Sequence, residues 1–423
     1  MGNRRVVVTG LGVVSPLGSH LPEFWENITA GMSGAGPITR FDPTLSNTKT
    51  KFACEVRNFD VTEYIDRKEA RKLDACAQFS VGAGVQAVND SGLDLRSENL
   101  DRIGVIMGIG IGGCQSFQSG LTSVNQQKES GQEPRLTPFF IPQIIGSMTA
   151  GYLSIKFGFH GPGYVTSAAC ASGTNALIDA VNMIRLGKAD VMLTGGSEAP
   201  LIDSGIAGFN AMHALSTRND SPATASRPMS GSRDGFVIAE GAACLVLEEY
   251  NHAISRNAHI YAEVAGWGLS SDAFHITAPD PEGAGAIKVM QNALDDAGMR
   301  PEDVDYINMH GTSTPLGDVA ECKAIRSVFG EHVYDMNLSA TKSMTGHLLG
   351  GAGAIEGVIS VMSVMNDIVP PTINHEDGDN DEQIDYRMNF TFNKAQKRTV
   401  RAALSNTFGF GGHNACIIFK KPE

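Results

Sequence analysis

The chain lacks the cysteine pattern of a disulfide framework or of a zinc site. Its 423 residues include seven cysteines, an odd number, and none of them form a CxxC pair. Small secreted domains carry even sets of closely spaced cysteines, and zinc sites carry paired ones. We therefore expect free thiols in a reducing compartment and no structural zinc.

The sequence also lacks a recognisable leader and a long hydrophobic run. Its N-terminus passes almost directly into RVVVTGLGVV, without the charged, apolar and small-residue regions of a signal peptide. No uninterrupted apolar run reaches membrane-spanning length. These absences lead us to expect a soluble, cytoplasmic protein that is not embedded in a membrane.

The sequence also has fewer basic than acidic residues. Lysine and arginine number 33 against 46 aspartates and glutamates, so the formal net charge is −13. A general nucleic-acid-binding protein is usually basic overall, and we expect no nucleic-acid partner. One local basic cluster is present, and by itself it is typical of a solvated helix face. Its members are Arg67, Lys68, Arg71 and Lys72.

What the sequence does contain is the alternation of short apolar runs with longer helical patterns. The segment ASGTNALIDAVNMIRLG, for example, has apolar residues at helical spacing and ends on a glycine. Alternating strands and helices predict an α/β fold with largely parallel sheets. The expected strands lie near 4–10, 102–108, 164–169, 190–196, 242–249, 260–268, 304–311, 336–342 and 415–421.

The two halves of the chain resemble each other in the order of their segments. The opening RVVVTGLGVVS is echoed by YAEVAGWGLSS, and two runs that end in Ala-Cys and apolar residues lie at 242–249 and 415–421. The region 165–196 is echoed near 338–362. We predict an internal duplication, with halves 1–255 and 256–423 packed as one unit, and an exposed acidic loop at 375–383.

Cys170 is the candidate nucleophile. It follows a strand-like run, stands at the first turn of a helical pattern, and has only small neighbours in TSAACASG. Unpaired N–H groups at a helix start favour an anion, and a thiolate there can have a lowered pKa. The alternative is a small buried core residue, which is how we interpret the other six cysteines.

Two histidines are candidate partners for that cysteine. His310 and His347 each follow a strand-like run, and ligands of α/β sheets gather where strands end. His347 occupies the duplicated counterpart of the Cys170 turn, so both helix starts are expected to face one site. The helix after His347 is apolar and should be buried, so Glu356 within it needs a partner, for which Lys342 is the candidate.

A competing motif is GxGxxG, formed by Gly108, Gly110 and Gly113, with Glu129 further along. In a dinucleotide enzyme such glycines admit a pyrophosphate. The preceding strand does not open a strand–helix–strand unit here, because CQSFQSGLTSVNQQKES leads to no clear strand. We keep a dinucleotide enzyme as the weaker alternative.

Four sequence blocks together closely resemble the elongating β-ketoacyl-acyl-carrier-protein synthases of the thiolase superfamily. TSAACASG surrounds Cys170, HGTSTPLGD starts at His310, KSMTGH joins Lys342 to His347, and SNTFGFGG is the glycine-rich block before the final strand. The likeness covers essentially the whole chain and is best to the single-chain, synthase II-like enzymes. It implies a thiolase-like fold, with two duplicated α/β halves packed as a layered αβαβα unit.

The resemblance also implies a two-step reaction for this family member. Cys170 takes an acyl chain from its carrier protein, and malonyl carrier protein then loses carbon dioxide and attacks the acyl-cysteine. The product is a β-ketoacyl-acyl-carrier protein, as in fatty-acid chain elongation. No cofactor and no metal are expected, since the phosphopantetheine arrives on the carrier protein.

Residue roles follow from the same resemblance. Backbone N–H groups of Cys170 and Phe410 would stabilise the acyl oxyanion, and His310 and His347 would donate to the malonyl enolate oxygen. Lys342 would hold His347 and its neighbours in place through Glu356. Further implied positions are Asp318 and Glu321 as supporting residues, Thr312 and Thr314 for pantetheine, Phe408 and Phe410 as the gating loop, and Ile111, Phe139 and Phe140 for the acyl pocket.

Partners are implied in the same way. We expect a homodimer in which the TPFF segment at 137–140 reaches the pocket of the other subunit. The basic cluster at 67–72 would then dock the acidic carrier protein. Two departures from the family pattern concern gating and docking: His413 stands in GFGGHN, and His213 stands where an arginine is usual.

Two related alternatives stay open. A non-catalytic chain-length factor would keep the fold but lose the cysteine, and Cys170 is present. A polyketide-type synthase shares the chemistry, although the short single-chain layout favours fatty-acid synthesis. The preferred acyl-chain length does not follow from the sequence.

Overall fold

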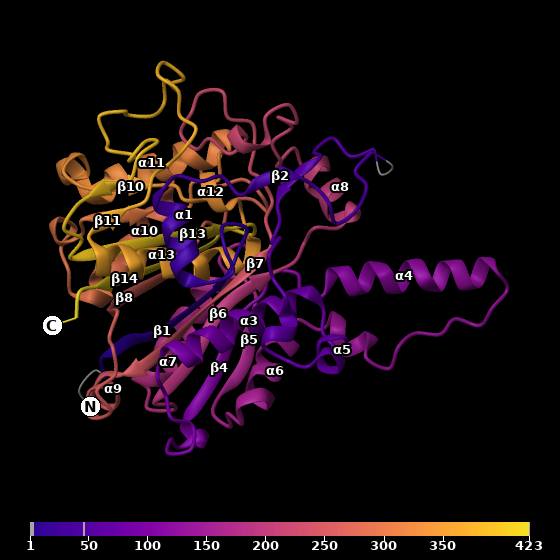
Figure 1. The fold of residues 1–423 in the computed structure, drawn as a ribbon. Coiled ribbons are helices and arrows are strands. Elements are labelled where there is room, and N and C mark those ends of the chain that lie inside the picture. Colours follow the sequence, from indigo (N-terminus) through magenta and orange to yellow (C-terminus); the bar gives the residue numbers. More distant parts are fainter. Residues whose placement is uncertain (1–3, 45–46, 423) are drawn as a thin grey trace.

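The computed structural model describes residues 4–44 and 47–422, and its centre is one continuous sheet (Figure 1). The order of its ten strands is β10-β9-β13-β14-β8-β1-β7-β6-β4-β5. The bounds are β1 Val6–Val14, β4 Ile103–Gly108, β5 Gly163–Thr166, β6 Val191–Glu198, β7 Gly241–Glu249, β8 Ala262–Ser271, β9 Tyr306–Asn308, β10 Asn337–Ser339, β13 Ala402–Gly409 and β14 His413–Lys420.

The two halves of this sheet repeat one pattern. From β1 outward, β7 and then β6 pair antiparallel, and β4 and β5 pair parallel. From β8 outward, β14 and β13 pair antiparallel, and β9 and β10 pair parallel. The halves join where β1 meets β8 antiparallel, between Val6–Val8 and Ala262–Val264. A boundary at 255/256 stays a prediction, since the sheet runs through the join.

Helices form layers on both sides of these strands, as the α/β prediction requires. The expectation of largely parallel sheets was wrong, because the five pairs at the centre of the ten-stranded sheet are antiparallel. The central helices are α7 (Ser172–Arg185), packed on β4 and β6, and α13 (Ala352–Asn366), packed on β7 and β13. These two helices also contact each other. On the outer faces, α3 (Ala75–Asp90) covers β1, and α10 (Ala284–Ala297) covers β8. Because α13 contacts β7 in one half of the sheet and β13 in the other, the central helices lie between the two halves. The layer order is therefore α, β, α, β, α.

Helix α13 is the most apolar long helix in the described part of the chain that lies next to the candidate site. The stretch Leu349–Asn366 is apolar and long enough to cross a membrane, by length and composition alone. However, 89% of it is buried inside the protein, which is typical of a core helix. The prediction that this helix is buried is therefore confirmed, and the stretch is not an uninterrupted apolar run, because Glu356 lies in its middle.

Glycines allow the starts of the two central helices to approach closely. A Cβ atom on Gly173 would lie 3.0 Å from the Gly350 carbonyl oxygen and 2.7 Å from the Ala354 nitrogen. One on Gly196 would lie 2.7 Å from the same Gly350 oxygen. Such separations leave no space for a larger residue. The duplicated turns thus meet at one place, next to which the candidate site lies.

Strand β13 differs from the sequence expectation. Its residues 405–409 belong to the block predicted only as glycine-rich, yet they pair with β14, and Ala403–Ser405 also pair with β9. Predicted strand ends elsewhere differ by a few residues. The remaining elements are α1 Leu21–Thr29, β2 Ala35–Pro37, β3 Phe52–Cys54, α2 Arg67–Ala70, α4 Cys114–Glu129, α5 Phe140–Ile144, α6 Met148–Phe157, α8 Asp203–Ala211, α9 Tyr250–Ser255, α11 Pro315–Phe329, α12 Lys342–Thr345, β11 Ile368–Val369 and β12 Gln396–Lys397, with short 3-10 turns between them.

Candidate active site

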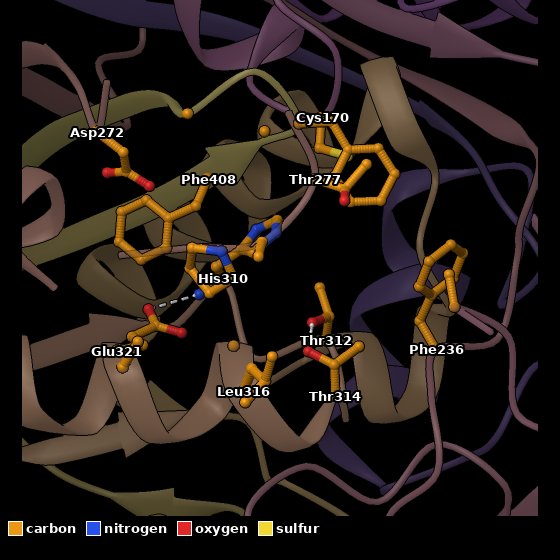
Figure 2. Close-up of a pocket in the computed structure, with 18 of the residues that line it drawn as sticks. Cys170, Phe236, Asp272, Thr277, His310, Thr312, Thr314, Leu316, Glu321 and Phe408 are labelled. Carbon is orange, nitrogen blue, oxygen red and sulfur yellow. Dashed lines mark hydrogen bonds between the residues drawn. The ribbon is translucent and has the colours of Figure 1, made fainter. Parts of the chain in front are cut away.

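A cavity of about 420 Å³ opens beside the two helix starts, and Cys170, His310 and His347 all line it (Figure 2). The structure thus brings the three predicted residues together from both halves of the chain. Most of the cavity wall is apolar, with aromatic side chains that include Phe236 and Phe408. An apolar, walled space next to a thiol suits a hydrophobic acyl thioester.

Cys170 lies on the connection from β5 to α7, two residues before the helix begins at Ser172, and its exposed fraction is 7%. Burial raises the pKa of its thiol to about 11, against the opposing influence of the Lys342 charge and of the Phe410 and Cys170 backbone N–H groups. The lowered pKa expected from the helix start is therefore wrong for the resting site. The thiol is protonated and needs a base.

His347 supplies a candidate base. Its Nε2 lies 3.1 Å from the Cys170 sulfur, and its ring packs edge-on against Phe236 at 5.1 Å between centroids. Burial, followed by the Lys342 charge, lowers the pKa of His347 well below its usual value, so the ring is neutral. His347 precedes α13 by five residues rather than starting it.

His310 follows β9 and faces His347 across the cavity, with ring centroids 5.5 Å apart. Its Nδ1 lies 3.3 Å from the ammonium nitrogen of Lys342. Burial and the neighbouring Lys342 charge lower the pKa of His310 well below its usual value. A neutral ring whose Nδ1 accepts from an ammonium group carries its proton on Nε2, so His310 presents an N–H donor from its other nitrogen.

Lys342 at the start of α12 forms a buried ion pair with Glu356 of α13, and it donates to the His310 carbonyl oxygen at 2.8 Å. The predicted partnership with Glu356 is confirmed. The hydrogen bonds of Lys342 in the described chain are with His310 and Glu356, so it positions His310 directly, and its hold on His347 stays a prediction. Burial raises the pKa of Glu356 to about 7, and the Lys342 charge opposes that rise.

Glu321 of α11 fixes the backbone that carries His310. Its two carboxylate oxygens accept the backbone N–H groups of His310 and Gly311, each at 2.8 Å. Burial raises the pKa of Glu321 to about 7. Glu321 therefore supports His310, as predicted, and it does so through hydrogen bonds to the main chain.

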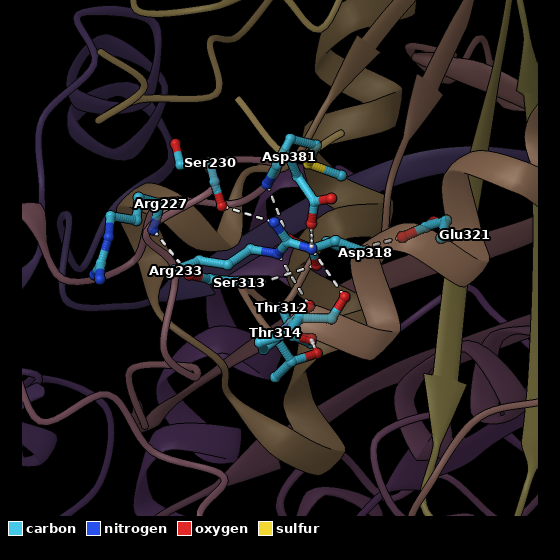
Figure 3. A network of polar contacts seen from close by, with 12 residues as sticks. Arg227, Ser230, Arg233, Thr312, Ser313, Thr314, Asp318, Glu321 and Asp381 are labelled. Carbon is cyan, nitrogen blue, oxygen red and sulfur yellow. Dashed lines mark hydrogen bonds and ion pairs between the residues drawn. The ribbon is translucent and has the colours of Figure 1, made fainter. Parts of the chain in front are cut away.

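Thr312 and Thr314 line the cavity, and their hydroxyl oxygens lie 3.0 Å apart. Figure 3 shows the network that holds them. Arg233, 1% exposed in its side chain, pairs with Asp318 at 3.2 Å and Asp381 at 2.8 Å, and donates to the Thr314 carbonyl oxygen at 3.2 Å. Asp381 belongs to the predicted exposed acidic loop, so part of that loop is anchored inward.

The glycine-flanked segment after Phe408 closes one side of the cavity. Phe408, Gly409, Phe410 and Gly412 line it, and the Phe408 ring lies 5.6 Å from that of His310. The Gly412 carbonyl accepts the Asp272 N–H at 2.9 Å, and Asn414 donates to the Asp272 carboxylate at 2.6 Å. His413 is exposed at the start of β14, and His213 lines the cavity.

Two predicted groups lie outside this cavity in the single chain. Ile111 and Phe139 are 56% and 39% exposed, and neither they nor Phe140 belong to its lining. In the basic cluster, Arg67, Lys68 and Arg71 are exposed, while Lys72 lies 5.4 Å from the Phe139 ring and pairs with Glu69 at 2.5 Å. The acyl-pocket and docking roles stay predictions.

The glycine motif does not have the contacts of a nucleotide site. The N–H groups of Gly110 and Gly112 donate to the Glu198 carboxylate, at 2.8 and 3.0 Å. These donors are therefore engaged within the protein rather than directed at a pyrophosphate. The seven cysteines are all free and buried. Within 4–44 and 47–422, no cluster of three or more His, Cys, Asp or Glu is suited to a metal ion.

Three residues that contact the site were not singled out from the sequence: Arg233, Asp272 and Glu198. Each is a charged residue next to glycine or serine in a loop or at a strand end, as in GSRDGF, LSSDAF and TGGSEA. A charged side chain directly after a buried apolar strand is the available signal, and for Glu198 it follows DVMLTGG.

A thiol and two neutral imidazoles, set after strands of both halves of a duplicated five-layered α/β fold, define a thiolase-like condensing enzyme. The Beta-ketoacyl synthase N-terminal domain matches residues 3–253, and the corresponding C-terminal domain matches residues 261–376. The chain belongs to the β-ketoacyl synthase family.

Named relatives and solved structures support the same family. Proteins named 3-oxoacyl-[acyl-carrier-protein] synthase 2 are similar over nearly the full length. The one from Coxiella burnetii is 47% identical over 100% of this chain and 99% of its own. The one from Synechocystis is 46% identical over 99% of this chain and 98% of its own.

A β-ketoacyl synthase structure from Burkholderia phymatum has a TM-score of 0.89 at 33% identity, covering 99% of this chain and 100% of that one. A second structure has a TM-score of 0.90 at 34% identity and full coverage of both chains. It is a type II polyketide ketosynthase in complex with its acyl-carrier protein. The present chain is therefore a ketosynthase, an enzyme of the transferase type.

Proposed function

We propose that Cys170 carries the growing acyl chain and that His310 and His347 activate malonyl-acyl-carrier protein for decarboxylative condensation. The observation that supports this proposal most strongly is the contact of 3.1 Å between His347 Nε2 and the Cys170 sulfur, with His310 on the same cavity. Lys342 and Glu321 then orient His310, one through its ring and carbonyl, the other through its backbone N–H.

In the first step, His347 Nε2 accepts the thiol proton as the Cys170 sulfur attacks the carbonyl carbon of an acyl thioester. The backbone N–H groups of Cys170 and Phe410, which already face the sulfur, stabilise the oxyanion. The bond from carbon to the carrier sulfur breaks, and the departing thiolate takes up the proton. The acyl group is then joined to Cys170.

In the second step, the carbon–carbon bond to the malonyl carboxylate breaks and carbon dioxide leaves. Its electron pair forms an enolate, whose oxygen accepts from the Nε2–H of His310 and from His347, whose proton moves from Nδ1 to Nε2 once the sulfur is acylated. The enolate carbon attacks the acyl-cysteine carbonyl, the carbon–sulfur bond breaks, and the released Cys170 thiolate takes up one proton from solvent. Thr312 and Thr314 place the pantetheine arm, and Phe408 and Phe410 gate the acyl pocket.

The proposed partners are acyl carrier protein and a second copy of the chain, with no nucleic acid and no membrane involved. A homodimer is supported by exposed apolar side chains near α4 and α5: Ile111, Phe117, Leu121, Ile141 and Ile145 are each at least 45% exposed. The dimer would bring Ile111, Phe139 and Phe140 to the acyl pocket, and the cluster Arg67, Lys68, Arg71 and Lys72 to the carrier protein. We place the reaction in the cytoplasm, with phosphopantetheine arriving on the substrate and no resident cofactor or metal.

A reconstituted condensation tests the proposed function. The chain is mixed with acyl- and malonyl-carrier protein, and intact-protein mass spectrometry follows the β-ketoacyl product while released carbon dioxide is counted. We expect one carbon dioxide for each product. Product formation by the Cys170→Ala variant, or product without carbon dioxide release, would contradict the proposed roles.

Polyketide condensation is the second candidate, because the structural neighbours include a polyketide ketosynthase bound to a hexaketide. The higher identity to the synthase 2 proteins, 46–47% against 34% for the type II polyketide ketosynthase, favours fatty-acid elongation. The same assay distinguishes them: repeated condensation without reduction of the β-keto group would indicate polyketide synthesis.

A further inference from the structure

Glu198 is a buried carboxylate that the two reaction steps do not use. It ends β6, and its exposed fraction is 0%. In the described part of the chain, no lysine, arginine or histidine forms an ion pair with it. A buried carboxylate without a cation is costly unless its oxygens accept several hydrogen bonds, so Glu198 needs donors close to both oxygens.

Four backbone N–H groups surround this carboxylate. Oε2 accepts from Gly110 at 2.8 Å and from Gly350 at 3.2 Å, and Oε1 accepts from Gly112 at 3.0 Å. The N–H of Ile111 lies 3.1 and 3.2 Å from the two oxygens. One side chain therefore ties the loop after β4 to the 3-10 turn Leu349–Gly351, which begins two residues after His347.

The tied segments lie directly behind the reacting groups. A Cβ atom on Gly350 would be 2.2 Å from the Gly110 nitrogen, and one on Gly108 would be 2.2 Å from the Ser172 carbonyl oxygen at the start of α7. Leu349 in the same turn lines the cavity. A displacement of the loop by one bond length would therefore move the wall behind Cys170.

The charge of Glu198 also reaches the nucleophile. Burial raises the pKa of Glu198 to about 7, and the four N–H groups oppose that rise. The same carboxylate is one of the influences that raise the pKa of Cys170. Glu198 is thus coupled to Cys170 through space as well as through the backbone.

We infer that Glu198 is a positioning residue that fixes the acyl-chain side of the pocket, by holding Gly110–Gly112 against Gly350, and thereby determines which acyl thioesters acylate Cys170. This inference rests on the proposed function, since it assigns Ile111 and Leu349 to the path of the acyl chain. The clamp does not include His310, Lys342 or the two threonines, so the binding of malonyl-carrier protein should not depend on it.

Glu198→Gln is the direct test, because an amide keeps the size but its nitrogen cannot accept an N–H. Glu248→Gln is a matched control: Glu248 is also buried on the sheet, opposite Val191 at the far end of β6, and it pairs with Arg256. Rates of acyl transfer to Cys170 are measured with acetyl- and dodecanoyl-carrier protein, together with the KM for malonyl-carrier protein.

We expect Glu198→Gln to change the dodecanoyl-to-acetyl rate ratio by about 10-fold or more, since small displacements near a reacting centre have effects of that order. The malonyl KM should stay unchanged, and Glu248→Gln should keep the wild-type ratio. Glu198→Asp, which keeps the charge on a shorter side chain, should change the ratio less than Glu198→Gln. An unchanged ratio in folded Glu198→Gln would overturn the inference.

The same experiment distinguishes failure of this inference from failure of the proposed function. If the proposed function fails, the wild-type protein forms no acyl-enzyme with either substrate. If neither Glu198 variant folds, amide hydrogen exchange on wild-type protein decides. Slow exchange at residues 110–112, comparable to β6, supports the clamp. Exchange as fast as that of an open loop would overturn it.

Discussion

Lys342 gives the sharpest test of how His310 is oriented. Its ammonium group touches three things: the Glu356 carboxylate, the His310 carbonyl oxygen at 2.8 Å and the His310 Nδ1 at 3.3 Å. Lys342 and Glu356 are both almost fully buried, with side chains 2% and 1% exposed. Lys342→Met would keep an unbranched side chain, one atom shorter than lysine, and remove all three contacts.

The expected loss of stability follows from the unpaired carboxylate. Removing one member of a buried ion pair destabilises a protein by about 3–5 kcal/mol. The double variant Lys342→Met/Glu356→Gln removes both charges, so most of that loss should be recovered. Chemical denaturation of the wild type, both single variants and the double variant measures the free energies of unfolding as a complete cycle.

The rate of decarboxylation distinguishes a role of Lys342 in orienting His310 from a role as the ion-pair partner of Glu356. Without the ammonium group, nothing holds the proton of His310 on Nε2, so the enolate donor is weakened in both Lys342 variants. We expect carbon dioxide release from malonyl-carrier protein to fall on the order of 100-fold or more, the size of effect seen when one oxyanion donor is lost. If the double variant recovers both stability and decarboxylation, Lys342 is only the partner of Glu356 and the reasoning fails.

Three further predictions concern charge and proton transfer. His310→Ala should slow decarboxylation on the order of 100- to 1000-fold while acylation of Cys170 is much less affected; equal losses in both half-reactions would contradict the assigned role. Because the pKa of Cys170 is raised to about 11, its alkylation by iodoacetamide, followed by mass spectrometry, should accelerate about tenfold per pH unit above neutrality, and a plateau near neutral pH would contradict this. A hydrogen bond to Glu248 raises the pKa of His252, so this contact stabilises the fold fully below the unfolded pKa and less as the pH rises through the folded value. His252→Gln should therefore lower the Tm more in mildly acidic than in alkaline buffer, and the reverse order would refute the contact.

Much of the fold follows from patterns of neighbouring residues. Buried parallel strands are continuous apolar runs, and RIGVIMG and DVMLTGG became β4 and β6 within a residue or two of their predicted bounds. Strand β13 was missed because its outer half, SNTFG, is polar and glycine-containing. Its strand conformation comes from pairing with β9 and β14, which are distant in sequence.

The site divides in the same way. Cys170, His310 and His347 could be selected from the sequence because each follows a strand and lies in a distinctive block, and the structure brings all three to one cavity. The side-chain contacts between these residues were harder to predict than the residues themselves. Lys342 is nearer to His347 in sequence than to His310, yet the three-dimensional arrangement of α12 directs its ammonium group to His310.

The pKa of Cys170 shows the limit of local reasoning most clearly. A helix start lowers a thiol pKa when the sulfur is partly exposed, but here desolvation is the larger influence and the pKa rises. Burial is a property of the packed molecule, and no sequence motif carries it. The role of Glu198 was hidden for the same reason, since its partners come from two loops far apart in the chain.

The central claim is that the acyl group is carried by Cys170. Intact-protein mass spectrometry followed by peptide mapping, after exposure to acyl-carrier protein, tests it most directly. The account predicts one acyl group per chain, on the peptide that contains Cys170, and none in Cys170→Ala. An acyl group that maps to another residue, or acylation that persists in that variant, would contradict the account.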